Sequence, residues 1–162
     1  MIRLNGKTVD FTVFPNGEAK LDNTDLQIYS HNEVLFKYEN DSDLIRLMFL
    51  KKYLDTSKAI VELVITYMPY SRMDRSENDS PFTLKYVADF INGLSFNTVT
   101  LIEPHSDVTP ALINNSIVKY INYELLPMVV QKVSFDTEED YIMFPDAGAS
   151  KRYSKMKFKN VI

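Results

Sequence analysis

Apolar and polar positions alternate with a period of two at the start of the chain. The alternation covers residues 1–14 and brackets Asn5-Gly6, a dipeptide that favours the tight turn of a β-hairpin. Two short stretches with the same period follow at residues 25–30 and 32–39. This part of the sequence therefore predicts an amino-terminal β-hairpin and two further strands.

From residue 40 onward, helical and strand-like segments take turns. Leucines recur at three- and four-residue intervals in residues 40–58, which predicts a helix capped by Ser42 or Asp43. The apolar run at residues 59–68 predicts a strand without a solvated face, as in parallel sheets that helices cover on both sides. The later segments are predicted as a helix at 81–94, a strand at 97–104, a short helix and irregular chain at 107–121, a buried strand at 140–145, a helix at 148–157 and a strand at 158–162.

This alternation predicts an α/β fold with a mainly parallel sheet flanked by helices. The sequence contains no internal repeat or linker, and 162 residues suit one domain, so we expect residues 1–162 to form a single domain. Ligands of such sheets bind at the carboxyl ends of the strands. The loops that follow residues 59–68, 97–104 and 140–145 are therefore the places to search for a site.

Composition narrows the class of protein. A net charge of −4 gives no electrostatic footprint for nucleic acid. The absence of cysteine excludes disulfides and thiolate zinc sites. No apolar run has the length of a signal peptide or a membrane helix, so we expect a cytoplasmic protein that binds neither nucleic acid nor membrane.

Two arginines and an aspartate follow the first buried strand. Guanidinium groups are preferred partners for phosphate, and Asp74 lies between Arg72 and Arg75. The alternative is a surface loop with an incidental Arg–Asp pair, which is worth only about 0–1 kcal/mol. Taken alone, this loop favours the alternative.

The other two strand ends carry groups that bind metals or anions. Glu103, His105 and Asp107 offer oxygen and nitrogen to a divalent ion, whereas a histidine that donates to a backbone carbonyl is the commoner arrangement. Asp146 follows the strand predicted at residues 140–145, and the alternative there is an ordinary helix cap, which suits Ser150 better than Asp146.

The three loops are more informative together, because the predicted sheet brings strand ends side by side. Two arginines, a histidine and several carboxylates in one crevice suit a magnesium–nucleotide complex better than a hydrolase triad. The sequence has neither of the common phosphate loops, GxxxxGK[ST] and GxGxxG.

Four segments in the same order resemble motifs of ribose-phosphate pyrophosphokinases. Residues Tyr70 to Arg75 are similar to the family's Y-x-R-Q-D-R loop, and Glu103-Pro104-His105 to its D-L-H element. Pro145 to Ala149 are similar to P-D-x-G-G, and Phe14 to Glu18 to F-x-D-G-E. The resemblance implies a phosphoribosyltransferase-like fold and a transferase of nucleotide biosynthesis. This enzyme moves pyrophosphate from Mg·ATP to ribose 5-phosphate.

The resemblance also implies roles for individual residues. Adenine would be gripped by a loop from a neighbouring subunit, so a homo-oligomer is expected, and Mg²⁺ would be the cofactor. The implied ATP-binding residues are Phe14, Asn16, Glu18, Arg72, Met73, Asp74 and Arg75, and the implied magnesium residues are His105 and Asp146.

The chain departs from the family pattern in two ways. Asn16 replaces an aspartate, Met73 a glutamine and Ala149 a glycine, and Glu103-Pro104 replaces Asp-Leu. The family also has a second α/β domain with a catalytic lysine and arginine and a ribose 5-phosphate loop, and no segment of the sequence matches these. We therefore expect an amino-terminal half with no identified catalytic residue and little activity of its own.

Two other functions are open. One is a non-catalytic, family-like protein that binds partners or regulates an intact synthetase. The other is a phosphoribosyltransferase, which is disfavoured because no acidic run is followed by threonine and glycine.

Overall fold

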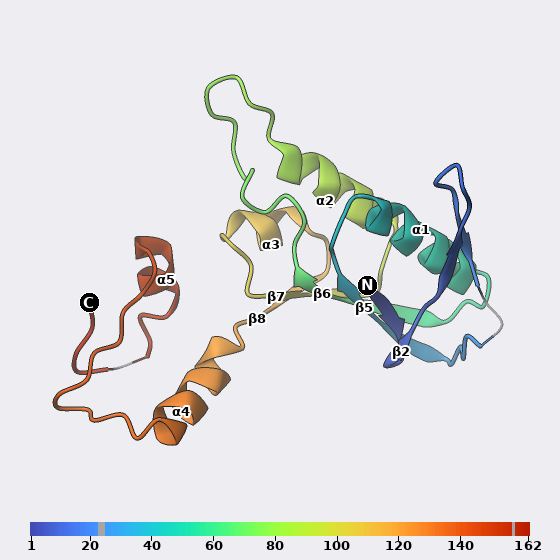
Figure 1. Ribbon diagram of the computed structural model, residues 1–162. Coiled ribbons are helices and arrows are strands. Elements are labelled where there is room, and N and C mark those ends of the chain that lie inside the picture. Colours follow the sequence, from blue (N-terminus) through green and yellow to red (C-terminus); the bar gives the residue numbers. More distant parts are fainter. Residues whose placement is uncertain (23–24, 157) are drawn as a thin grey trace. The chain divides into compact units, whose positions relative to one another are not determined.

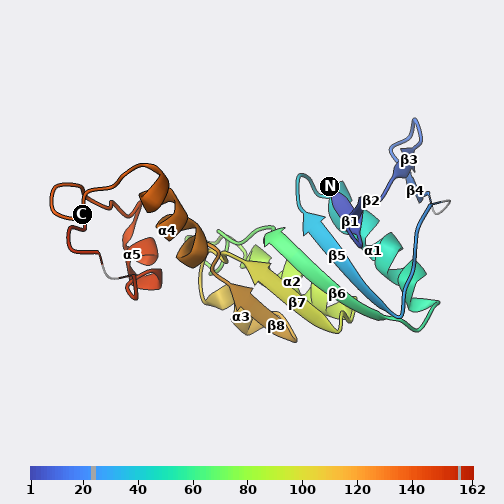
Figure 2. The same ribbon diagram turned by 90° about the horizontal axis from the view of Figure 1, so that it is seen from below.

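Six strands pair into one sheet in the order β2-β1-β5-β6-β7-β8, as Figures 1 and 2 together show for the computed structural model of residues 1–22, 25–156 and 158–162. The strands are β1 (Ile2–Leu4), β2 (Lys7–Thr8), β5 (His31–Lys37), β6 (Ile60–Tyr67), β7 (Thr98–Ile102) and β8 (Ser116–Lys119). Strands β5 to β8 are parallel, and β1 is antiparallel to both β2 and β5. The predicted mainly parallel sheet with an amino-terminal hairpin is confirmed.

Three helices lie on one face of this sheet: α1 (Ser42–Asp55), α2 (Thr83–Gly93) and α3 (Val108–Leu112), as Figures 1 and 2 show. The strand residues on that face form the core, with Phe36, Leu63 and Leu101 buried almost completely. On the opposite face Val64 and Thr100 are only half-buried. The helical cover that the sequence predicts for both faces is thus seen on one face within this part of the chain.

Helix α1 begins without either of its predicted caps. Asp41 is the residue at its start, and no side-chain hydrogen bond caps the helix. The buried Asp43 instead accepts hydrogen bonds from the backbone N–H groups of Glu39 and Asn40, at 3.0 and 3.3 Å. Its carboxylate therefore stabilises the connection from β5 into α1.

The amino-terminal hairpin is shorter than predicted. Asn5 and Gly6 have φ angles of 51° and 83°, as a tight hairpin turn requires. The chain then leaves the sheet, and β3 (Phe11–Val13) pairs with β4 (Ala19–Leu21) in a separate two-stranded sheet. This second hairpin lies beside α1, where the Arg46 guanidinium sits 5.8 Å from the centre of the Phe11 ring.

The strand predicted at residues 25–30 is wrong, because hydrogen bonds to two asparagine side chains replace strand pairing. The Tyr29 N–H donates to Asn32 Oδ1 at 2.9 Å, and Asn32 Nδ2 donates back to the Tyr29 carbonyl at 2.8 Å. Asn5 Nδ2 donates to the Gln27 carbonyl at 3.1 Å. The Gln27 carbonyl and both backbone groups of Tyr29 thereby find partners without a neighbouring strand.

The chain divides into two compact units, Met1–Lys119 and Tyr120–Ile162. The second unit contains α4 (Asn122–Lys132) and α5 (Ala147–Arg152). Tyr123, Phe144 and Tyr153 form an aromatic cluster, with the Tyr123 and Tyr153 ring centres 5.5 Å apart. The single domain predicted for residues 1–162 stays a prediction.

The two strands predicted near the end of the chain are wrong. A single parallel bridge joins Ile142 to Val161, and Met143 is 74% exposed rather than buried. The last helix, predicted at 148–157, ends at Arg152, and residue 157 lies outside the described residues. In the ranges that the structure describes, every helix is too short or too polar to cross a membrane.

Candidate functional site

The loop that follows β6 turns its charged side chains in opposite directions. Tyr70 has a φ of 60°, and the Met73 N–H donates to the Tyr70 carbonyl at 3.0 Å, which closes a turn. Ser71 and Asp74 are buried, whereas Arg72, Met73 and Arg75 are exposed. The loop therefore presents two guanidinium groups and a thioether at the carboxyl end of a parallel strand.

Asp74 is the buried anchor of this loop. Its carboxylate accepts a hydrogen bond from Arg75 Nε at 3.1 Å, and Arg75 also pairs with Glu77 at 3.4 Å. The pKa of Asp74 is lowered, first by the Ser106 hydroxyl and then by Arg75 and the charge of His105, while burial acts in the opposite direction. The Ser106 hydroxyl lies close enough to the Asp74 carboxylate to lower its pKa, although the two groups do not form a hydrogen bond of full geometry.

His105 and Ser106, in the loop after β7, lie close enough to Asp74 to lower its pKa, so the loops after β6 and β7 are neighbours. Glu103 has a φ of 48°, and its N–H donates to the Lys119 carbonyl at 3.0 Å. The chain then reverses into α3, with Asp107 at the helix start and its side chain not used as a cap. His105 is exposed, so its imidazole is accessible at this edge of the sheet.

The two predicted magnesium ligands belong to different compact units of the chain. Within residues 1–22, 25–156 and 158–162, no group of three or more histidine or acidic side chains is arranged to hold a metal ion. His105 belongs to the first unit and Asp146 to the second. The magnesium role of these two residues stays a prediction.

Asp146 acts as the cap of α5. Its Oδ1 accepts a hydrogen bond from the Ala149 N–H at 2.7 Å, the geometry of a helix N-cap. A Cβ added at Gly148 would lie 3.1 Å from the same oxygen, so a side chain there would require the Asp146 carboxylate to shift slightly. The capping role that the sequence assigned preferentially to Ser150 thus falls to Asp146.

The loop predicted to bind adenine, residues 14–18, is the tip of the β3–β4 hairpin. All five residues are exposed, and Gly17 has a φ of 88°. Phe14 and Glu18 line a cavity of about 400 Å³ together with Ile45 and Phe49 from α1. Figure 2 shows this hairpin beside α1 and away from α2 and α3.

Sequence reasoning missed a carboxylate with two phenols at the same edge of the sheet. The hydroxyls of Tyr38 and Tyr70 each donate to Asp41 Oδ1, both at 2.5 Å. The two phenols lower the pKa of Asp41, and this carboxylate raises the pKa of Tyr38 and of Tyr70. Tyr38 and Tyr70 follow the neighbouring strands β5 and β6, and this position after two strands is the sequence feature that could have pointed to the cluster.

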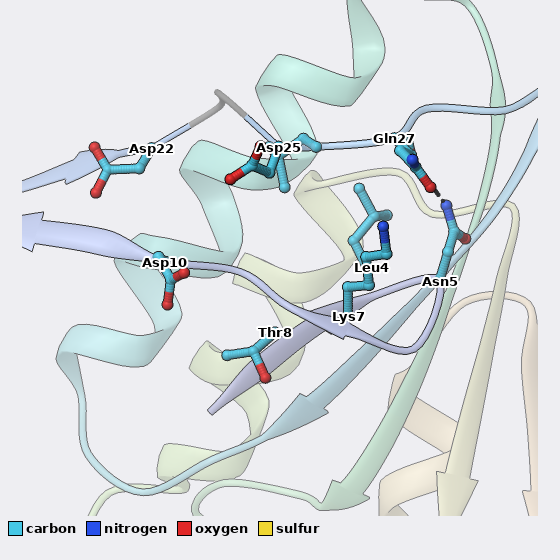
Figure 3. Close-up of a pocket in the computed structure, with 9 residues that line it drawn as sticks. Leu4, Asn5, Lys7, Thr8, Asp10, Asp22, Asp25 and Gln27 are labelled. Atoms are coloured by element: carbon cyan, nitrogen blue, oxygen red, sulfur yellow. Dashed lines mark hydrogen bonds between the residues drawn. The ribbon is translucent and has the colours of Figure 1, made fainter.

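A further cavity, of about 100 Å³, lies away from these loops. Figure 3 shows Asp10, Asp22 and Asp25 around it, between the β1–β2 hairpin and the segment that follows β4. None of the predicted site residues lines it.

Comparisons with known proteins confirm the resemblance. No protein-family model matches the chain. The chain is 25% identical over 121 residues to the ribose-phosphate pyrophosphokinase of Fusobacterium nucleatum, covering 74% of this chain and 38% of that protein. It is 23% identical over 159 residues to the ribose-phosphate pyrophosphokinase of Sulfurisphaera tokodaii, covering 91% of this chain and 51% of that protein.

A solved structure confirms the fold. The phosphoribosylpyrophosphate synthetase of Mycobacterium smegmatis superposes with a TM-score of 0.77 at 17% identity, covering 95% of this chain and 54% of that one. The chain thus spans about half the length, or less, of the proteins it matches.

Proposed function

We propose that residues 1–162 are the nucleotide-binding half of a ribose-phosphate diphosphokinase. The observation that supports this most is the loop after β6, which holds Asp74 inside and turns Arg72 and Arg75 outward at the ligand-binding edge of a parallel sheet. Arg72 takes part in none of the ion pairs found in the described ranges, so its guanidinium is available to phosphate.

The proposed reaction moves a pyrophosphoryl group. The 1-hydroxyl oxygen of ribose 5-phosphate forms a bond to the β-phosphorus of ATP and its proton passes to solvent. The bond from that phosphorus to the bridging oxygen of the α-phosphate breaks, and AMP leaves with that oxygen. Charge spreads over the phosphate oxygens, so cationic groups supply most of the stabilisation. In this chain, Arg72 and Arg75 would orient the phosphates of ATP.

Mg²⁺ would neutralise phosphate charge when it is bound. It takes one or two protein ligands and fills its remaining positions with phosphate oxygens and water, so the sparse donors near His105 suit it. We propose His105 as the residue of the first unit that serves this ion, and Asp146 as a second, after release of the Ala149 N–H.

We propose that a second copy of the chain completes the nucleotide site. The hairpin with Phe14 and Glu18 lies beside α1, whereas Arg72 and His105 lie where β6 and β7 lead toward α2 and α3. In this proposal the hairpin that contacts the nucleotide comes from a neighbouring subunit. Residues 1–162 alone are expected to form no AMP from ATP and ribose 5-phosphate.

The test is a calorimetric titration of the chain with ATP, with and without Mg²⁺. The Arg72→Ala/His105→Ala double variant is compared with Arg3→Ala/His31→Ala, which removes the same residue types at exposed positions of β1 and β5. Saturable, magnesium-sensitive binding that only the first variant loses supports the proposal. Equal binding by both variants would contradict it.

A second candidate is a family-like protein that binds partners without catalysis. Asp146 is occupied as a helix cap, and Met73 exposes a thioether where the family pattern has a glutamine. This candidate predicts no magnesium-dependent ATP binding, together with retained self-association or pairing with an intact synthetase.

A further inference from the structure

Three of the chain's four glycines directly follow an asparagine. Asn-Gly is the dipeptide that deamidates most readily, because glycine has no side chain to shield its backbone nitrogen from the asparagine side chain. The three pairs are Asn5-Gly6, Asn16-Gly17 and Asn92-Gly93. The fold gives them very different surroundings.

Both the nitrogen and the oxygen of the Asn5 side-chain amide form hydrogen bonds. Its Nδ2 donates to the Gln27 carbonyl at 3.1 Å and to Asn32 Oδ1 at 3.0 Å. Its Oδ1 accepts from the Glu33 N–H at 2.9 Å. The Asn5 side chain cannot turn toward the Gly6 nitrogen without losing these three hydrogen bonds.

Asn92 is fixed in the same way near the end of α2. Its Nδ2 donates to the Leu112 carbonyl and its Oδ1 accepts from the Asn114 N–H, both at 2.8 Å. Gly93 is itself part of the helix, so its backbone has a helical conformation. This pair is held by side-chain hydrogen bonds and by the helix together.

Asn16 lies in the exposed turn of the β3–β4 hairpin. Its Oδ1 accepts from the Glu18 N–H at 3.2 Å, and its Nδ2 donates to none of the described residues. The Gly17 N–H donates to the Phe14 carbonyl at 2.8 Å across the turn. Nothing lies within 4 Å of the position that a Gly17 Cβ would take.

We propose that Asn16 is a site of spontaneous deamidation and that Asn5 and Asn92 are protected from it by the fold. The Gly17 nitrogen forms a bond to Asn16 Cγ, and Nδ2 leaves as ammonia with the proton of the Gly17 amide. Water then opens the cyclic imide. Cleavage at Cγ gives aspartate, and cleavage at the main-chain carbonyl gives isoaspartate.

The modification adds one negative charge to the hairpin tip. Gly17 and Glu18 line the cavity of about 400 Å³ that Phe14, Ile45 and Phe49 complete. A carboxylate at residue 16 would directly precede Gly17 and lie close to the Glu18 backbone, and aspartate is the residue type of the F-x-D-G-E pattern. Any effect on adenine binding rests on the proposed function, whereas the deamidation itself does not.

Peptide mass mapping of the aged protein tests the proposal. The folded chain is incubated at mildly alkaline pH, and conversion at the three Asn-Gly pairs is followed in the same samples. We expect Asn16 to convert about tenfold faster than Asn5 and Asn92, or more, because those two must break additional hydrogen bonds first. In urea, where the fold is lost, the three rates should converge.

An Asn16→Gln variant is the matched control, since its longer side chain cyclises far less readily and the turn keeps an amide. It should show no fast conversion in the folded chain. Equal rates at the three pairs in the folded protein, or an Asn16 that converts only in urea, would overturn the proposal. The measurement needs no ATP, so its failure is distinct from failure of the proposed function.

Discussion

Asn32 joins three separate segments of the first unit, and its replacement by alanine is the sharpest test of how the fold is held. The side chain is fully buried at the start of β5. It accepts hydrogen bonds from Asn5 Nδ2 at 3.0 Å and from the Tyr29 N–H at 2.9 Å, and donates to the Tyr29 carbonyl at 2.8 Å. It also donates to the Ile60 carbonyl at 3.5 Å, which is a weak bond.

The size of the effect follows from what the truncation leaves behind. Asn5 Nδ2 keeps the Gln27 carbonyl as a partner, whereas both backbone groups of Tyr29 lose theirs. A buried group without a partner costs about 1–3 kcal/mol, and partial access of water to Tyr29 reduces this. We expect Asn32→Ala to lower the free energy of unfolding of the first unit by about 2–4 kcal/mol.

The assay is urea denaturation followed by circular dichroism, with amide hydrogen exchange of β5 and β6 as a probe confined to the first unit. Asn114→Ala is the control, because Asn114 is exposed and its side chain makes no hydrogen bond to the described residues. The control should change stability by less than about 0.5 kcal/mol. An Asn32→Ala variant as stable as the control would refute the reasoning.

Three further predictions concern the carboxylates of Asp41, Asp74 and Asp146. In Asp41→Asn the pKa of Tyr38 and of Tyr70 should fall toward the ordinary value, because the carboxylate that raises both is gone, and ultraviolet pH titration of the phenols measures this. The lowered pKa of Asp74 stabilises the fold at pH values above the pKa of this group in the unfolded state, and that stabilisation is lost as the pH falls. The free energy of unfolding should therefore drop more between pH 7 and about pH 3 in the wild type than in Asp74→Asn. Asp146→Ala should destabilise α5 by about 1 kcal/mol through loss of its cap, seen as faster amide exchange at Ala149.

The parallel sheet and its site loops were predictable because their signals are local. Residues 59–68 form an apolar run and residues 81–94 have a helical pattern, and β6 and α2 form within them. Arg72, Asp74 and His105 follow strand ends, where the topology of a parallel sheet fixes their place. The sequence therefore identified both loops that the structure brings together.

The remaining features depend on contacts between distant segments. Residues 25–30 alternate like a strand, yet the side chains of Asn5 and Asn32 take the Gln27 and Tyr29 carbonyls as partners instead. The apolar run at residues 140–145 finds one bridging partner, Val161, because a short apolar run alone does not specify sheet pairing.

Strand β8 and helix α4 were not predicted, for similar reasons. Strand β8 is only four residues long and its pairing comes from β7, and α4 contains Pro127, which local propensity disfavours inside a helix. The hydrogen bonds of Tyr38 and Tyr70 to Asp41 join the ends of two strands that α1 separates in the sequence. No local pattern reports such a contact.

The most direct test of the central claim is amide hydrogen exchange of the chain with and without Mg·ATP. Nucleotide binding at the ends of β6 and β7 predicts slower exchange in residues 69–76 and 103–108, and in residues 14–18 if a second copy completes the site. Protection that is absent, or that appears only around the cavity lined by Asp10, Asp22 and Asp25, would contradict the account.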